Sequence, residues 1–90
     1  MAAVLMYCTA TCPYCQAAER LLRNKGVTDL EIVRVDLEPR RRTEMMQRSG
    51  RHTVPQIWIG TRHVGGCDDL YALERQGRLD ELLRETTEAG

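Results

Sequence analysis

The chain has 90 residues, the length of one small domain, and its 13 basic and 13 acidic side chains cancel to a net charge of zero. This balance excludes the strongly basic surface that binds nucleic acid or an anionic membrane. The first residues carry no basic segment and the apolar run after them is short. We therefore expect no signal peptide and no membrane span. The expected location is the cytoplasm.

Apolar residues recur at strand or helix spacing along the chain. In chain order, the predicted elements are a strand over residues 4–7, a helix over 13–24, a strand over 30–36, a helix over 39–49, strands over 56–59 and 62–64, and helices over 69–76 and 79–85. Because a helix separates the first two strands, we expect them to be parallel, whereas the turn at Gly60 makes the last two a hairpin. This order predicts a thioredoxin-like α/β fold, βαβαββα plus a C-terminal helix. A four-stranded mixed sheet would be flanked by helices in a single domain over residues 1–90.

Some side chains receive specific expectations from this pattern. Met45 and Met46 are expected to face the core from the second helix, and Asp68 is expected to cap the third. His63 is expected at the surface, with no partner that the sequence reveals. The last residues, 86–90, are expected to fray.

Two cysteines stand where the first strand passes into the first helix. Pro13 has the fixed φ and the missing N–H that suit the first helical position, so Cys12 is expected to be the N-cap. Its sulfur would then face the unpaired N–H groups at the positive end of the helix, which stabilise a thiolate. We expect Cys12 to be an exposed, reactive thiol and Cys15, one turn on and buried, to be its partner in a dithiol redox site.

The cysteines also allow other interpretations. Three of the four fall between residues 8 and 15, which argues against a secreted disulfide framework but leaves a buried pair of small apolar side chains open. A zinc knuckle would need a second pair of similar spacing, which Cys8 and Cys67 do not form. The spacing of Cys8, Cys12 and Cys15 occurs in iron–sulfur radical enzymes, but those have a far larger barrel. We expect no metal, and a packed Cys8.

Two later segments have both a structural and a functional interpretation. Pro55 either starts an edge strand or follows a cis bond that leaves the backbone of Val54 free to pair with an extended, peptide-like substrate. The glycine-rich segment that ends in Cys67 and Asp68 is either a turn with a capping aspartate or a backbone nest for a carboxylate, with the aspartate holding an ammonium group. Arg42 stands in a run of three arginines and is by default a solvated residue.

Three motifs in this order carry a resemblance to a known family. From about residue 4 to residue 83 the chain resembles the dithiol glutaredoxins, in particular the small bacterial glutaredoxin 3 type, through the segments Cys12-Pro13-Tyr14-Cys15, Thr53-Val54-Pro55 and Gly65-Gly66-Cys67-Asp68-Asp69. The resemblance implies a glutathione-dependent thiol–disulfide oxidoreductase that reduces protein disulfides and glutathione mixed disulfides. It implies that Cys12 is the nucleophile and Cys15 the resolving thiol.

The resemblance also implies a co-substrate and partners. Glutathione would be the reductant and would bind in a groove formed by Tyr14, Arg42, Thr53, Val54, a cis Pro55, Gly66, Cys67 and Asp68. The implied protein partners carry disulfides or glutathionylated cysteines, and ribonucleotide reductase is a candidate among them. Nucleic acid and membrane are not expected as partners, and the chain is expected to be a monomer.

One position departs from the resemblance, and two rival functions stay open. The family commonly has a lysine three residues before its first active-site cysteine; here Thr9 takes that place and removes a cation near the thiolate and a contact to glutathione. The first rival is a redoxin that thioredoxin reductase reduces and that donates electrons to ribonucleotide reductase; the segment over residues 65–69 favours glutathione instead. The second is a carrier of a glutathione-ligated [2Fe–2S] cluster shared by two chains, which Pro13 is thought to disfavour.

Overall fold

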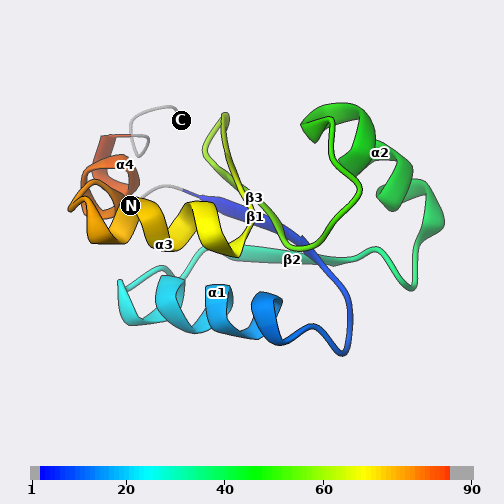
Figure 1. Cartoon of the computed structure of the whole chain (residues 1–90), viewed down its shortest axis with the longest axis horizontal. Coiled ribbons are helices and arrows are strands. Elements are labelled where there is room, and N and C mark those ends of the chain that lie inside the picture. Colours follow the sequence, from blue (N-terminus) through cyan, green and yellow to red (C-terminus); the bar gives the residue numbers. More distant parts are fainter. Residues whose placement is uncertain (1–2, 86–90) are drawn as a thin grey trace.

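A four-stranded mixed sheet in the order β2-β1-β3-β4 organises residues 3–85, the part of the chain that the structure, a computed structural model, describes. The elements are β1 (Val4–Cys8), α1 (Pro13–Asn24), β2 (Leu30–Arg34), α2 (Pro39–Ser49), β3 (Gln56–Ile59), β4 (Arg62–Gly65), α3 (Cys67–Arg75) and α4 (Leu79–Glu85) (Figure 1). β1 pairs in parallel with β2 and antiparallel with β3, and β3 pairs antiparallel with β4. The predicted element order, strand directions and thioredoxin-like fold are confirmed.

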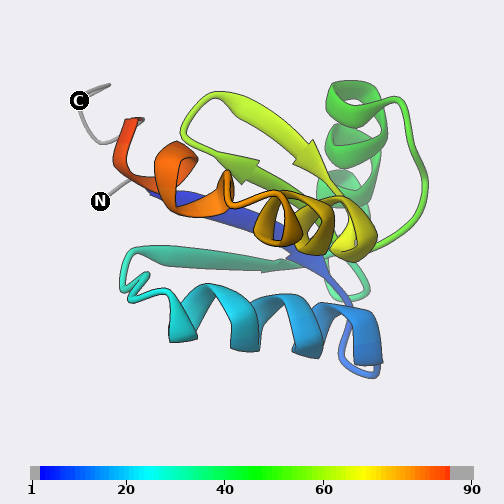
Figure 2. The same ribbon diagram turned by 60° about the vertical axis from the view of Figure 1, so that its left-hand side comes forward.

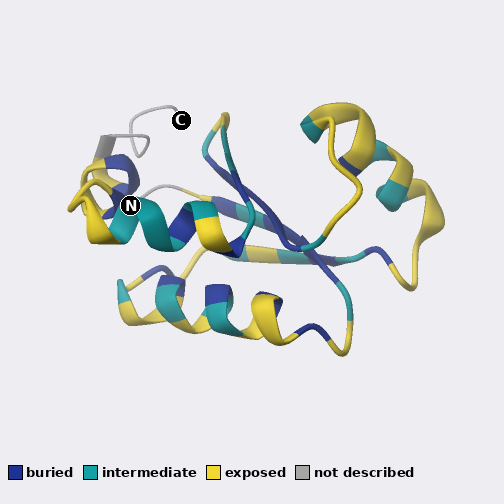
Figure 3. Ribbon diagram, in the orientation of Figure 1, coloured by how far each residue is buried: buried dark blue, intermediate teal, exposed yellow. Residues whose placement is uncertain are grey.

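The two faces of the sheet are covered by different helices. Successive side chains of a strand point to opposite faces, so Val4, Met6 and Cys8 of β1 pack with α1, α3 and α4, whereas Tyr7 packs with Met45 of α2. Figures 1 and 2 show α1 and α3 side by side, with α2 apart from them. Figure 3 shows the central strands as mostly buried. Among the described helices, none has the length and apolar character needed to cross a membrane.

Several expected details are corrected by the structure. Met45 is fully buried, but Met46 is 38% exposed, because neighbouring residues of a helix point about 100° apart and only one can face the sheet. β2 ends at Arg34 and not at Asp36, where the chain turns and the two side chains form an ion pair at 2.7 Å. The tail 86–90, expected to fray, lies outside the described residues.

α2 is joined to the sheet by a buried hydroxyl group as well as by apolar contacts. The Tyr7 hydroxyl donates a hydrogen bond to Glu44 and accepts one from Arg48 Nη1 at 3.0 Å. The Arg48 guanidinium also lies over the Trp58 ring, 4.4 Å from its centroid. Burial and the neighbouring Glu44 raise the pKa of Tyr7, so the phenol stays protonated and can donate at neutral pH. This helix carries Arg42, so its docking affects where that side chain can reach.

We predict that Tyr7→Phe lowers the free energy of unfolding by about 1.5–3 kcal/mol, because hydrogen bonds between a fully buried tyrosine and the charged Glu44 and Arg48 are lost. Urea denaturation followed by circular dichroism measures the change. Tyr14→Phe is the matched control, since this tyrosine is 64% exposed, and its stability should match that of the wild type. Equal stability of both variants would contradict the prediction.

Candidate active site

The first turn of α1 holds the sulfur of Cys12. Cys12 is the N-cap of the helix, Pro13 follows at the first helical position, and Cys12 Sγ accepts a hydrogen bond from the Cys15 N–H at 3.2 Å. The predicted N-cap is confirmed. The expected exposure is wrong, because Cys12 is only 8% exposed: its thiol faces the loop before β3, with Sγ 3.9 Å from the Val54 carbonyl oxygen.

Cys15 is the deeper of the two thiols, at 3% exposed. Burial raises the pKa of Cys15 strongly, and the neighbouring Cys12 raises it further, so Cys15 stays protonated at neutral pH. Burial also raises the pKa of Cys8 and of Cys67. Cys8 packs in the core as expected, and Cys67 lies at the start of α3.

The loop before β3 faces the dithiol, and the Val54–Pro55 bond within it is cis, as the resemblance implied. Beside it lies a groove of about 200 Å³. The groove is lined by Tyr14, Arg51, Thr53, Val54, Pro55, Gly66, Cys67, Asp68 and Asp69. The structure thus brings together seven of the eight residues expected to bind glutathione, although their roles stay predictions. The eighth, Arg42, is not part of this lining; its Nη1 lies 3.5 Å from the carbonyl oxygen of His52.

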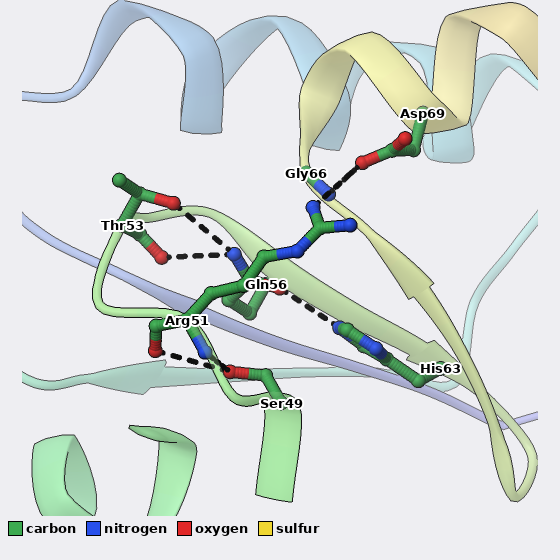
Figure 4. A network of polar contacts seen from close by, with 7 residues as sticks. All are labelled: Ser49, Arg51, Thr53, Gln56, His63, Gly66 and Asp69. Carbon is green, nitrogen blue, oxygen red and sulfur yellow. Dashed lines mark hydrogen bonds and ion pairs between the residues drawn. The ribbon is translucent and has the colours of Figure 1, made fainter.

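An aspartate that the sequence interpretation passed over holds one wall of the groove together. Asp69 Oδ2 accepts hydrogen bonds from the Gly66 N–H and from Arg51 Nη1, both at 2.9 Å (Figure 4). The expected cap by Asp68 is wrong, because α3 begins at Cys67 and its third residue is then Asp69, which can reach back to the N-cap N–H. An acidic residue three positions after a glycine was the signal available in the sequence.

A second polar chain supports the other wall. Gln56 is fully buried, and its Nε2 lies 3.1 Å from the Thr53 carbonyl oxygen, while its Oε1 lies 2.8 Å from His63 Nε2 (Figure 4). His63, expected at the surface with no partner visible in the sequence, is therefore partly buried and bonded to Gln56; its ring also packs on Trp58 with 4.5 Å between centroids. Burial, followed by the positive charge of Arg51, lowers the pKa of His63. Gln56 and His63 lie seven residues apart on different strands, so no local pattern in the sequence could predict this contact.

Comparison with known proteins identifies the class and the family. A thioredoxin-like fold with a Cys-x-x-Cys at the start of α1 opposite a cis-proline loop is the framework of a thiol–disulfide oxidoreductase. The family model described as Glutaredoxin matches residues 4–64, and the chain belongs to the glutaredoxin family. The family's activity is glutathione-dependent thiol–disulfide exchange, and this chain is such an enzyme.

The relatives cover almost the whole chain. A glutaredoxin of Pseudomonas aeruginosa is 55% identical over 92% of this chain and 98% of its own length. Glutaredoxin 3 of Escherichia coli strain K12 is 54% identical over 93% of this chain and 100% of its own length. Among solved structures, a glutaredoxin of Brucella melitensis has a TM-score of 0.82 and 50% identity over 98% of this chain and 94% of that chain. A buckwheat glutaredoxin–glutathione complex has a TM-score of 0.86 and 27% identity over 94% of this chain and 79% of that chain.

We predict that Gly65→Ala is more destabilising than Gly77→Ala. Both glycines have positive φ, +116° and +71°, so both substitutions incur a backbone cost of about 1–2 kcal/mol. Only at Gly65 would the new Cβ clash with a side chain, 2.3 Å from Asp69 Oδ2, which should add roughly 1–3 kcal/mol. Urea denaturation of both variants measures the difference, and equal losses would show that the contact of Asp69 with Gly66 and Arg51 does not hold in solution.

A pH dependence follows from Asp69. The hydrogen bond from the Gly66 N–H, followed by that from Arg51, lowers the pKa of the Asp69 carboxyl. A lowered pKa means that the ionised carboxylate stabilises the folded state above the unfolded pKa of about 4, and that this stabilisation is lost as the pH falls through the folded pKa. We therefore expect the stability gap between wild type and Asp69→Asn to be constant above pH 5 and to shrink between pH 4 and pH 2.

Thermal denaturation across this pH range measures the gap. Asp29→Asn is the matched control, since Asp29 is exposed and its carboxylate forms no ion pair within residues 3–85. A gap for Asp69→Asn that widens towards low pH would overturn the assignment.

Proposed function

We propose that this glutaredoxin reduces protein disulfides and glutathione mixed disulfides with Cys12 as the nucleophile and Cys15 as the resolving thiol. The observation that carries the proposal is the position of Cys12 Sγ, which accepts the Cys15 N–H at the start of α1 while facing the Val54 carbonyl. A thiolate at this place receives a charge-assisted hydrogen bond and the favourable end of the helix dipole.

The exchange runs in balanced steps. The Cys12 thiolate attacks one sulfur of a protein disulfide, forms a mixed disulfide and releases the other sulfur as a thiolate, which takes up a proton. Cys15 then loses its proton and attacks the Cys12 sulfur, which releases the reduced protein and leaves a Cys12–Cys15 disulfide. Two glutathione molecules reduce this bond through a Cys12–glutathione disulfide and leave as oxidised glutathione.

The high pKa of Cys15 fits the order of these steps. The negative charge of Cys12 is one cause of the raised pKa of Cys15. This contribution disappears once the Cys12 sulfur is part of a mixed disulfide and carries no charge. Cys15 thus becomes easier to deprotonate at the stage when it has to attack. For a glutathionylated substrate, Cys12 alone suffices, because a second glutathione can resolve the Cys12–glutathione disulfide.

We further propose that the groove binds glutathione in an extended form. The backbone of Val54 would pair with the cysteine of glutathione beside Pro55 and Thr53, and the exposed ring of Tyr14 would flank it. The solved complex of the buckwheat glutaredoxin with glutathione supports this choice of ligand. Arg42 stays a candidate for the glycine carboxylate, although it lies outside the groove lining.

The start of α3 suits the γ-glutamyl end of glutathione. N–H groups at the first turn of a helix can hold a carboxylate, and here the N–H groups of Cys67 and Asp68 would do so, because Asp69 already accepts the hydrogen bond of the Gly66 N–H. The Asp68 carboxylate forms no hydrogen bond or ion pair within residues 3–85 and could accept the α-ammonium group. We also propose a monomer that acts in the reducing cytoplasm, with ribonucleotide reductase as one candidate partner.

The two active-site cysteines separate the two reactions. We predict that Cys12→Ser loses both activities, because no nucleophile remains, and that Cys15→Ser loses protein disulfide reduction but keeps deglutathionylation. The hydroxyethyl-disulfide assay with glutathione and an insulin reduction assay measure the two activities. Cys8→Ala removes a buried thiol outside the groove lining and should keep both.

Deglutathionylation by Cys12→Ser at the wild-type rate would refute the nucleophile assignment. Loss of deglutathionylation in Cys15→Ser would refute the one-thiol route. Equal losses in Cys8→Ala and Cys12→Ser would show that the assay reports folding rather than chemistry.

A further inference from the structure

We propose that Gln56 and His63 are positioning residues for glutathione: through a buried chain of hydrogen bonds they fix the direction of the Val54 N–H. The inference rests on the proposed pairing of Val54 with glutathione. Neither residue lines the groove, and neither touches the reacting sulfur atoms.

Gln56 is an unusual residue for its place. It is the first residue of β3, all four residues of that strand are buried, and Gln56 itself is 0% exposed. A buried amide costs stability unless its hydrogen-bonding groups are satisfied. Here Nε2 donates to the Thr53 carbonyl oxygen at 3.1 Å and faces Thr53 Oγ1 at 3.3 Å, and Oε1 faces His63 (Figure 4).

These contacts determine which atom carries each hydrogen. Both N–H groups of the Gln56 amide face oxygen atoms of Thr53, so the amide oxygen must be the atom that faces His63. An oxygen can only accept, so His63 Nε2 must carry a hydrogen. The His63 ring is held in turn by Trp58, its neighbour across the β3–β4 pair. In this series of hydrogen bonds, His63 therefore donates to Gln56 and Gln56 donates to Thr53, and the series is anchored in the sheet through Trp58.

The orientation of the Thr53 carbonyl sets that of the Val54 N–H, because both belong to one peptide plane. In a trans peptide the carbonyl of one residue and the N–H of the next point in opposite directions, and the Thr53–Val54 bond is not among the cis bonds. Because Gln56 draws the Thr53 carbonyl inward, the Val54 N–H points outward. No hydrogen bond occupies that N–H within residues 3–85. The N–H proposed to bind glutathione is thus oriented by an amide behind it.

The Thr53 hydroxyl is constrained by the same amide. Its oxygen accepts from Gln56, so this contact does not use the hydroxyl hydrogen, and Thr53 is part of the groove lining. One buried side chain therefore holds both the carbonyl and the hydroxyl oxygen of a residue that lines the groove.

Gln56→Glu is the sharpest test, because the side chain keeps its shape but loses the N–H groups that hold Thr53. With a peptide that carries a glutathione mixed disulfide as substrate, we expect KM to rise about tenfold, which corresponds to about 1.4 kcal/mol, and kcat to change less than twofold. The rate of Cys12 alkylation by iodoacetamide should stay at the wild-type value, since the contact between Cys12 and α1 is untouched. Gln47→Glu, the same change on an exposed position of α2, is the matched control and should leave KM unchanged.

Two further measurements keep the test decisive if Gln56→Glu folds poorly. His63→Phe keeps the ring on Trp58 but removes the donor, and we expect a smaller rise in KM, about threefold. Nitrogen NMR of the wild-type His63 ring should show the hydrogen on Nε2 in the neutral form.

The possible failures point to different claims. An unchanged KM in Gln56→Glu, or a neutral His63 with its hydrogen on Nδ1, would overturn the positioning role while leaving the proposed function intact. A rise in KM together with a fall in kcat and in the alkylation rate would show a general structural role instead. Failure of the wild type to turn over the glutathionylated peptide would overturn the proposed function itself.

Discussion

The sulfur of Cys12 lies between the first turn of α1 and the carbonyl of Val54, and the sheet is what brings these two sides together. β1 and β3 are antiparallel neighbours in which Tyr7 is paired with Gln56. The chain therefore leaves β1 and enters β3 at the same end of the sheet, and the segments outside these two strands must face each other. The N-cap of α1 follows the first strand and the cis-proline loop precedes the second, so one pair of strands places both halves of the site.

Polar side chains, rather than extra apolar packing, set the finer geometry of the groove. A domain of this size has only a modest core, so its loops cannot all rest on apolar contacts. One wall of the groove depends on Gln56 behind Thr53, and the other on Asp69 between Arg51 and the start of α3. Each of these links joins a loop to a regular element. The groove is thus shaped before any ligand arrives, which reduces the ordering cost of binding.

The elements and motifs could be predicted from local pattern, whereas contacts between distant segments could not. Strand and helix positions followed from apolar spacing, and the N-cap at Cys12 followed from Pro13 because both effects act within one turn. The burial of Cys12 depends on a loop 42 residues away, and the hydrogen bond between Gln56 and His63 joins two strands. Neither contact can be predicted from the spacing of residues within one segment. The error at Asp68 was different: a helix start misplaced by two residues moved the capping role to the wrong aspartate.

Cys12 is the proposed nucleophile, and the contributions that would stabilise a thiolate at its position can be ranked by free energy. A helix terminus stabilises a nearby negative charge by about 0.3–1 kcal/mol, and up to about 2 in a partly buried place. A hydrogen bond to a charged group contributes about 1.5–3 kcal/mol, and Cys12 accepts one directly from the Cys15 N–H. An exposed cation at position 9 would add about 0–1 kcal/mol, so having Thr9 there instead of a lysine removes the smallest of the three terms. The proposed role of Cys12 would therefore depend chiefly on the shape of the first turn of α1, where Pro13 has its φ fixed in the helical range.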